Sequence, residues 1–236
     1  MGGSSASDAS EAPAEKRRKL DGEDEGGVVV PRAPSTRYER VKRGDVLVRR
    51  YEEEAGTVAG CAGHALALTL ARREAEALPG LVVVELGSSD GCAGLTAAKL
   101  GAAKVLFTDV HAEAMASLVV DAAVNGVGGT TQVVDYEWGA ALPRTLAAHK
   151  VGLVLAADVL NTPWDGTCVG VTLDLLAANS PGLRALIAVS KFGGAMEEEN
   201  LRAIEERGWK RANVAVHADD AAAVAGEATI VEFTKK

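Results

Sequence analysis

The sequence predicts a doubly wound, Rossmann-like α/β domain with a seven-stranded sheet that ends in an antiparallel hairpin. Strand-like and helical segments alternate from residue 81 to residue 207, as in a parallel sheet covered by helices on both faces. The last two strand-like segments, 213–217 and 228–234, have no convincing helix between them, which indicates a hairpin. The chain has 236 residues, of which 47% are hydrophobic, enough to bury one substantial core. We therefore expect one such domain.

Residues 1–36 are expected to form a disordered tail, and residues 37–236 the domain. The tail has no aromatic residue and consists largely of Gly, Ser, Ala, Pro and charged residues, so it has too few apolar groups to offset the entropy of ordering. Its basic cluster, Lys16-Arg17-Arg18-Lys19, is similar to a nuclear-import signal. A run of four charges in a polar tail is more often simply solvated, so both interpretations stay open.

The first elements of the domain are a strand and a helix. Residues 45–51 mix apolar and polar side chains in a manner suited to a short strand, which could form half of an N-terminal hairpin. Residues 62–78 are rich in Ala and Leu, with Arg and Glu toward the end, and Pro79-Gly80 follows. This pattern predicts a helix that ends before the proline.

Regular alternation begins with a run of β-branched residues, Val82-Val83-Val84, that is typical of a strand buried on both faces. Each later strand is followed by a segment with helical spacing of apolar residues. The expected strands are 81–84, 104–108, 131–134, 151–157 and 183–190, and the expected helices are 93–100, 112–122, 166–178 and 195–207.

Composition narrows the classes of partner. The formal charge of −8 and the pI near 5.1 argue against a nucleic acid or a membrane surface, because phosphate groups attract clustered Lys and Arg. The three cysteines and four histidines lack the spacing of metal ligands, so we expect no metal site. No bilayer-length apolar run and no secretory signal are found, so a cytoplasmic protein is expected, also nuclear if the basic cluster acts. A monomer is expected, and the oligomeric state stays open because no apolar stripe stands apart from the predicted core.

The sharpest motif, Glu85-Leu86-Gly87-Ser88-Ser89-Asp90-Gly91, lies where the first buried strand turns into its helix. Gly87 and Gly91 allow a tight turn that exposes backbone N–H groups to a ligand. A pyrophosphate would suit a helix N-terminus, but Glu85 and Asp90 place negative charge beside it. Carboxylates there favour the cationic amino group of a methionine moiety, so the expected cofactor is S-adenosylmethionine rather than a dinucleotide.

A second acid, Asp109, follows the next strand. From this position both carboxylate oxygens could accept hydrogen bonds from the two hydroxyls of a ribose. The alternative is a turn or N-cap Asp before the helix at 112–122, and position alone weighs the two about equally. Together with Glu85 and Gly87 the balance shifts to cofactor binding.

From about residue 45 to its end, the chain resembles methyltransferase family 16, the seven-strand group of protein-lysine methyltransferases. Five motifs in order carry the resemblance: Glu85-Leu86-Gly87 with Asp90-Gly91, Thr108-Asp109, Asn125, Glu137-Trp138-Gly139 and Ala157-Asp158-Val159. The resemblance implies the class I methyltransferase fold and a protein substrate that bears the target lysine. It also implies that Trp138 packs against the adenine and that Asp158 shapes the lysine channel. The residues implied to bind the cofactor are Glu85, Gly87, Ser88, Asp90, Gly91, Asp109, Trp138 and Ala157.

Asp158 has an alternative role, because an Asp at the end of a buried strand can cap the helix that follows. The sequence also departs from the family pattern. Ser89 stands where the family usually has Gly, which is acceptable if its φ is negative. Asn161 stands where an aromatic residue is usual, and Trp164, three positions later, is its candidate substitute. The expected catalytic set is therefore Asp158 with Asn161 and Trp164 lining the channel entrance.

The expected function is transfer of a methyl group to a protein lysine. Two alternatives stay open: a small-molecule N-methyltransferase of the same fold, and a non-catalytic interaction module that keeps the fold. A nicotinamide-dependent oxidoreductase is disfavoured, since no catalytic Tyr-Lys or His-Asp arrangement is recognisable.

Overall fold

The computed structural model describes residues 38–43, 45–51, 61–190, 194–216 and 228–235. All of these belong to one compact unit, residues 33–236. The predicted tail, with its basic cluster, lies outside the described residues. In the part of the chain that is described, no helix has the length and apolar content needed to cross a membrane.

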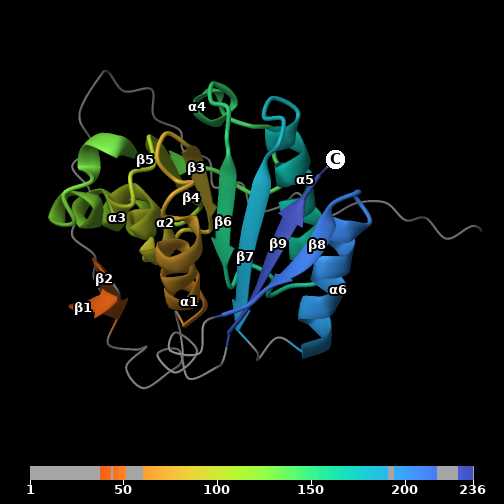
Figure 1. Cartoon of the computed structure of the whole chain (residues 1–236), viewed down its shortest axis with the longest axis horizontal. Helices are drawn as coiled ribbons and strands as arrows, with labels where there is room; N and C mark the ends of the chain where they lie inside the picture. The colour runs from red at the N-terminus through yellow and green to blue at the C-terminus, as the bar shows by residue number, and fades with distance from the viewer. Residues whose placement is uncertain (1–37, 44, 52–60, 191–193, 217–227, 236) are drawn as a thin grey trace, which may run out of the picture. The chain divides into compact units, whose positions relative to one another are not determined.

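A seven-stranded sheet forms the centre of this unit (Figure 1). Its first five strands run parallel, β9 is antiparallel to both of its neighbours, and β8 is the edge strand. The predicted fold class and its terminal hairpin are confirmed. In spatial order the strands are β5 (Thr131–Asp135), β4 (Lys104–Asp109), β3 (Val82–Leu86), β6 (Leu153–Ala157), β7 (Arg184–Ser190), β9 (Ala228–Thr234) and β8 (Lys210–Val214).

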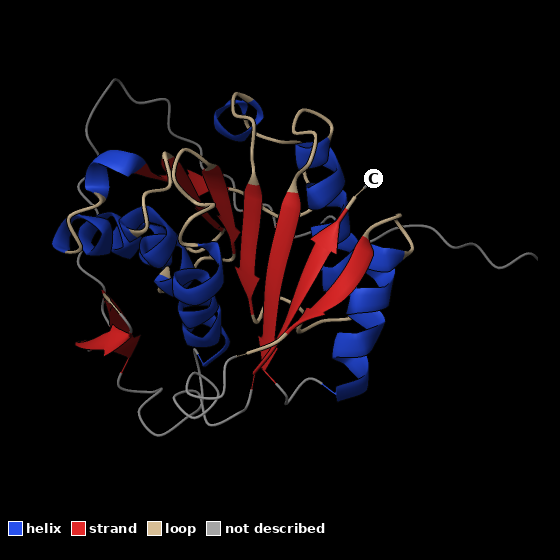
Figure 2. Cartoon of the chain, in the orientation of Figure 1, coloured by secondary structure: helices blue, strands red, loops and turns tan. Residues whose placement is uncertain are grey.

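Helices cover both faces of the sheet (Figure 2). Because side chains alternate along a strand, Val83 and Phe107 join the core on one face, while Val84 and Leu106 join the core on the other. Both faces are buried, which explains the unbroken apolar runs in the sequence. The first face packs against α1 (Cys61–Thr69), α2 (Cys92–Lys99) and α3 (Ala112–Val124), and the second against α4 (Arg144–Ala147), α5 (Asp165–Ala177) and α6 (Gly194–Glu205).

The predicted helix 62–78 is α1 followed by a π-helical turn, η2 (Leu70–Glu74). The carboxylate of Glu74 is buried and pairs with Arg184, with Oε2 accepting from Nη2 at 2.7 Å and Oε1 from Nη1 at 3.3 Å. Arg184 also pairs with Glu232 at 2.8 Å. These ion pairs tie the end of the helical segment to β7 and β9, a constraint that the local sequence pattern does not reveal.

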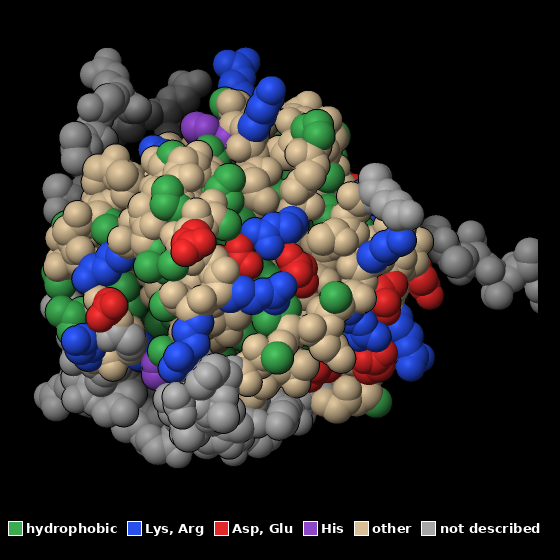
Figure 3. All heavy atoms as spheres, in the orientation of Figure 1, with side chains coloured by type: hydrophobic (Ala, Val, Ile, Leu, Met, Phe, Trp, Pro, Cys, Tyr) green, Lys and Arg blue, Asp and Glu red, His purple; other side chains and the backbone are tan. Residues whose placement is uncertain are grey.

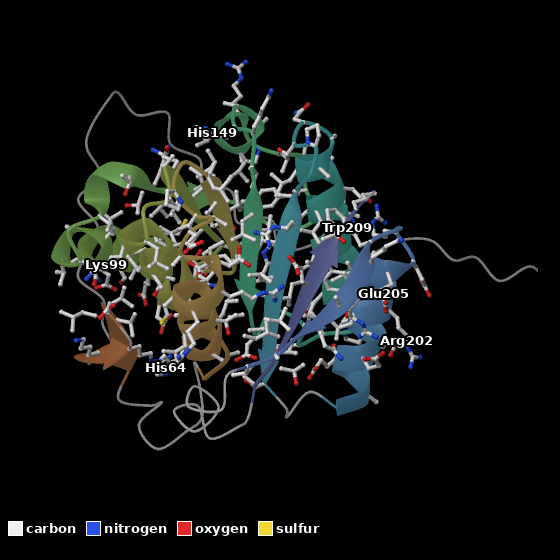
Figure 4. The ribbon with its side chains drawn as sticks, viewed as in Figure 1. His64, Lys99, His149, Arg202, Glu205 and Trp209 are labelled. Carbon is white, nitrogen blue, oxygen red and sulfur yellow. The ribbon has the colours of Figure 1, made fainter. Side chains whose placement is uncertain are left out.

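The edge strand β8 begins three residues before the predicted segment 213–217. Most of its residues are polar or exposed, as is usual for an edge strand, so its alternation is weak. Arg211 on β8 pairs with Glu198 and Glu205 of α6, at 2.9 and 3.3 Å. Arg202 and Glu205 are seen on α6 in Figure 4, and Figure 3 shows acidic and basic side chains interspersed over this part of the surface.

The N-terminal hairpin, β1 (Tyr38–Arg43) and β2 (Val46–Tyr51), is confirmed as an antiparallel pair. It packs on α2 and α3. Asn125 at the end of α3 accepts from the backbone N of Leu47 at 2.9 Å and donates to its carbonyl at 2.8 Å. Lys99 at the end of α2 (Figure 4) donates to the carbonyl of Asp45 at 2.6 Å. Three hydrogen bonds thus fix the hairpin to the sheet's helical layer.

Candidate active site

A pocket of about 570 Å³ lies where the carboxyl ends of β3, β4 and β6 meet. The connections after β3 and β6 leave toward opposite faces of the sheet, which is the switch point where open α/β sheets bind ligands. Seven of the eight residues predicted to bind cofactor line this pocket, together with Asp158. The seven are Glu85, Gly87, Ser88, Asp90, Asp109, Trp138 and Ala157.

The carboxyl group of Glu85 lines the pocket although the residue is only 4% exposed. Its Oε1 accepts from the backbone N of Gly94 at 3.2 Å, and its Oε2 has no hydrogen-bond partner among the described residues. Burial, and next the negative charge of Asp90, raise the pKa of Glu85 to about 8. An orphaned buried oxygen is costly, and a cationic ligand group would offset that cost.

Gly87 and Gly91 both have positive φ, but for different purposes. A Cβ on Gly87 (φ +61°) would lie 2.8 Å from Cζ2 of Trp138 and 3.1 Å from Cγ1 of Val159, inside the pocket. Gly91 (φ +69°) does not line the pocket, and its N–H donates to the carbonyl of Ser88 at 2.6 Å. A Cβ there would lie 2.4 Å from Cδ2 of Leu118. Gly91, which the family resemblance implies to bind the cofactor, instead closes the turn with its N–H and is not brought to the pocket with the other seven residues.

Both serines of the loop, Ser88 and Ser89, form hydrogen bonds that fix the local backbone. The hydroxyl of Ser88 donates to the carbonyl of Glu85 at 3.1 Å and accepts from the N of Thr108 at 3.0 Å, which joins β3 to β4. Ser89 has φ +44°, so the condition of a negative φ is not met. Its backbone N donates to Oδ2 of Asp109 at 3.0 Å, which holds it in this left-handed conformation.

Asp109 is only 7% exposed and is already engaged by the chain itself. Its Oδ1 accepts from the backbone N of Val110 at 2.8 Å and of His111 at 2.9 Å, and contacts Nδ1 of His111 at 2.9 Å. Within the described part of the chain, its Oδ2 accepts one hydrogen bond, from the backbone N of Ser89. The expectation that both oxygens serve a ribose is corrected: Oδ1 is occupied by three groups, and Oδ2 is the oxygen with a lone pair to offer.

Asp158 follows β6 with φ +52° and lines the pocket. Its Oδ1 accepts from the backbone N of Ser190 at 2.7 Å, and its Oδ2 accepts from the hydroxyl of Ser190 at 2.8 Å. It does not cap α5. That turn is closed instead by Asp165, whose Oδ2 accepts from the backbone N of Asn161 at 2.7 Å and of Thr162 at 2.6 Å.

Asn161 and Trp164, which were predicted to line the channel entrance, are not among the residues that line this pocket. The side-chain amide of Asn161 donates to the carbonyl of Asp158 at 2.5 Å, so it shapes the turn. The side chain of Trp164, just before α5, is 73% exposed. The structure therefore brings the side chain of Asn161 to the backbone of Asp158 but not into the pocket, and Trp164 is not among the residues that line it.

Several pocket residues were not predicted from the sequence, among them Arg43, Tyr136 and His111. Tyr136 is the first residue after β5 and His111 the second after β4, so their positions after strands could have indicated them. Arg43 comes from the hairpin, more than 40 residues before the first motif, and no pattern in the sequence connects the two. Only the packing of the hairpin on α2 and α3 brings Arg43 to the pocket.

Comparisons with known proteins agree with this geometry. A family model described as lysine methyltransferase matches residues 51–207, more than half of the chain. No individual curated protein matches by sequence.

Several solved methyltransferases share the fold. A 16S rRNA methyltransferase of T. thermophilus, in complex with S-adenosylmethionine and guanosine, aligns with a TM-score of 0.59 and 19% identity. That alignment covers 87% of this chain and 52% of the other, so the chain spans about half the length of that enzyme. Magnesium protoporphyrin IX methyltransferase of Synechocystis, with bound S-adenosylhomocysteine, aligns with a TM-score of 0.52 and 18% identity. That alignment covers 77% of this chain and 88% of the other. An S-adenosylmethionine-dependent methyltransferase of Aquifex aeolicus aligns with a TM-score of 0.53 and 18% identity, and the alignment covers 72% of this chain and 92% of the other.

At these identities the solved structures establish the fold alone. The family match adds the cofactor, and the pocket suits it: the orphaned carboxyl oxygen of Glu85 can receive an ammonium group, and Gly87 leaves room that any other residue would fill. The chain therefore belongs to the lysine methyltransferase family and is a methyltransferase that uses S-adenosylmethionine.

Proposed function

We propose that the enzyme transfers a methyl group to the side chain of a lysine in a protein. The observation that carries the proposal is the carboxylate of Asp158, which faces the cofactor pocket from the end of β6 and is fixed by two hydrogen bonds from Ser190. A lysine enters as an ammonium ion, so an oriented carboxylate at this place would attract it. The family description supports the same acceptor.

The cofactor would lie across the carboxyl ends of β3 and β4. Glu85 would receive the ammonium of its methionine moiety, Oδ2 of Asp109 a ribose hydroxyl, and Trp138 would pack on the adenine beside Gly87. S-adenosylmethionine supplies a methyl group on a positively charged sulfur. The residues of the chain then need to hold the acceptor in place and remove a proton from it, because methyl transfer depends mostly on proximity and orientation.

Asp158 is the residue proposed for both tasks at the acceptor. Each of its oxygens accepts one hydrogen bond from Ser190 and keeps a lone pair for the lysine. Glu197 on α6 adds negative charge nearby: burial, followed by the charge of Asp158, raises the pKa of Glu197. A carboxylate pair of this kind favours the approach of a cation, and Asp158 can take the proton that the amine must lose.

The test is transfer of labelled methyl from S-adenosylmethionine to a cell extract, with Asp158→Asn as the matched control. The variant replaces a carboxylate oxygen by an amide of equal size, so it is expected to bind cofactor normally and to transfer little methyl. The labelled products are divided by digestion with protease or ribonuclease and by filtration, and the protein fraction is hydrolysed and searched for methylated lysine.

Label recovered as methyllysine from the wild type, and lost in the variant, supports the proposal. If the label resists protease and is found in RNA or in small molecules, the acceptor is not a protein lysine and the proposal is wrong. Cofactor binding with no transfer to any fraction would favour the non-catalytic alternative.

A further inference from the structure

We infer that Arg43 binds the carboxylate of the methionine moiety of S-adenosylmethionine. Arg43 lies at the end of β1, outside the sheet and before residues 51–207 that the family model covers. The contact depends on the cofactor and not on which acceptor is methylated.

The balance of charge in the pocket leads to this assignment. Six of its lining residues carry carboxyl groups, and Arg43 is the one Lys or Arg among the described lining residues. The six are Glu85, Asp90, Asp109, Glu137, Asp158 and Asp165. Acidic groups suit the ammonium and the sulfonium of the cofactor but repel its carboxylate. A carboxylate bound in this pocket therefore needs the guanidinium of Arg43.

The position of Arg43 matches the headgroup of an α-amino acid, which carries an ammonium and a carboxylate on the same carbon. Such a headgroup needs an acid and a base only a few ångströms apart. Nη1 of Arg43 lies 3.5 Å from Oδ2 of Asp90, and the two side chains are 13% and 20% exposed. Asp90 in turn acts on Glu85, whose pKa it helps to raise. Arg43 thus stands beside Asp90, one of the two carboxyl groups expected to face the ammonium, and Asp90 is close enough to Glu85 to raise its pKa.

The hairpin holds Arg43 firmly enough for a binding role. Val46 and Val48 of β2 are fully buried in the core that α2 and α3 share. Asn125 and Lys99 fix the hairpin backbone at Leu47 and Asp45. An arginine on an anchored strand loses little further freedom on binding, and its planar group suits a carboxylate.

The experiment compares two ligands by calorimetric titration: S-adenosylmethionine and its decarboxylated form, which keeps the ammonium, sulfonium and nucleoside but lacks the carboxylate. The proteins are wild type, Arg43→Ala, Arg43→Gln and Lys42→Ala. Lys42 is the matched control, because it is the neighbouring cation on the same strand, is exposed and alternates to the other side. Thermal unfolding shows that each variant is folded.

Arg43→Ala is expected to weaken S-adenosylmethionine binding about 10- to 100-fold, the range for loss of a hydrogen-bonded charge pair, and to leave the decarboxylated ligand unchanged. The affinity of Arg43→Gln for S-adenosylmethionine should lie between those of wild type and Arg43→Ala. Lys42→Ala should bind both ligands as tightly as wild type does.

Equal weakening of both ligands by Arg43→Ala would overturn the assignment, since Arg43 would then shape the pocket through Asp90 without touching the carboxylate. Unchanged binding of both would overturn it as well. Neither result would bear on the lysine acceptor, because binding is measured without one.

Discussion

Ser190 donates a hydrogen bond to each oxygen of Asp158, from its backbone N at 2.7 Å and from its hydroxyl at 2.8 Å. The pair joins the ends of two adjacent parallel strands, β7 and β6. The orientation of the carboxylate that faces the pocket therefore depends on a residue that is not itself a pocket residue. Ser190 is a positioning residue if Asp158 acts on the acceptor.

Replacement of Ser190 by Ala removes the hydroxyl donor and leaves the backbone donor. Because hydrogen bonds to charged groups contribute about 1.5–3 kcal/mol, turnover is expected to fall about tenfold. Affinity for the cofactor should not change. The measurement is kcat and KM for the acceptor together with the cofactor Kd, and Ser190→Thr, which keeps a hydroxyl, should restore most of the rate. A loss that Thr does not restore, or an equal loss of cofactor affinity, would point to a structural role alone.

Glu85 makes stability depend on pH in a defined direction. Burial raises its pKa to about 8 from an ordinary value of 4.5, so the folded protein keeps a proton that the unfolded chain has lost. The contribution to stability is complete below pH 4.5 and declines as the pH rises toward 8, by about 1.4 kcal/mol per pH unit between these limits. Glu85→Gln has no such proton. Its free energy of unfolding, measured in urea at pH 5 to 8, should fall less steeply than that of wild type, and parallel curves would contradict the raised pKa.

The raised pKa of Glu85 also predicts how cofactor binding depends on pH. An ammonium beside Glu85 favours the carboxylate, so binding near pH 7 should release a proton, and affinity should rise with pH from 5.5 to 7.5. Titration calorimetry in buffers with different ionisation enthalpies measures the release. Glu85→Gln should release none, and a wild-type enzyme without proton release would remove Glu85 from the ammonium site.

Ser89 stores backbone strain, since it has φ +44° where a residue with a Cβ is disfavoured. Ser89→Gly and Ser89→Ala both remove the exposed hydroxyl, but only Gly relieves the conformation. The left-handed region costs a residue with a Cβ about 1–2 kcal/mol, partly offset by the entropy of Gly in the unfolded chain. The Gly variant should therefore be more stable than the Ala variant by about 1 kcal/mol in chemical denaturation. A more stable Ala variant would contradict the positive φ.

Much of the site could be predicted because it follows directly from buried strands. Glu85, Asp109 and Asp158 each lie at or just after the end of an apolar run, and parallel strands bring such ends to one edge of a sheet. What a side chain does there depends on partners that are remote in sequence. The hydrogen bond to Asp109 sets the backbone of Ser89, and Ser190 sets the carboxylate of Asp158.

The hairpin and the edge strand show features that the local sequence pattern does not predict. Asn125 belongs to a motif of the family resemblance, but its observed contacts are to the backbone of Leu47 in the hairpin. Nothing in the local pattern indicates that pairing or its consequence, the delivery of Arg43 to the pocket. At β8 the boundary was wrong because an edge strand with one neighbour needs no regular apolar alternation.

Gly87 provides a test of the pocket's shape. Ala at this position adds a Cβ that would lie 2.8 Å from Cζ2 of Trp138 and 3.1 Å from Cγ1 of Val159, so the indole must move. Its φ of +61° also strains the new residue. Overpacking of this kind costs about 1–3 kcal/mol, and a displaced Trp138 should weaken cofactor binding at least about tenfold.

Gly80→Ala is a control that separates the effect of backbone strain from the effect of displacing Trp138. It has φ +86°, yet a Cβ there would meet nothing within 4 Å. Gly80→Ala should lose stability through backbone strain, by about 1 kcal/mol, and keep the wild-type cofactor Kd. Because strain is common to both variants, the difference in Kd between them reports the contact of residue 87 with Trp138. If Gly87→Ala lost stability but bound S-adenosylmethionine as tightly as Gly80→Ala, Trp138 would lie away from the bound cofactor, and its proposed packing on the adenine would have to be abandoned.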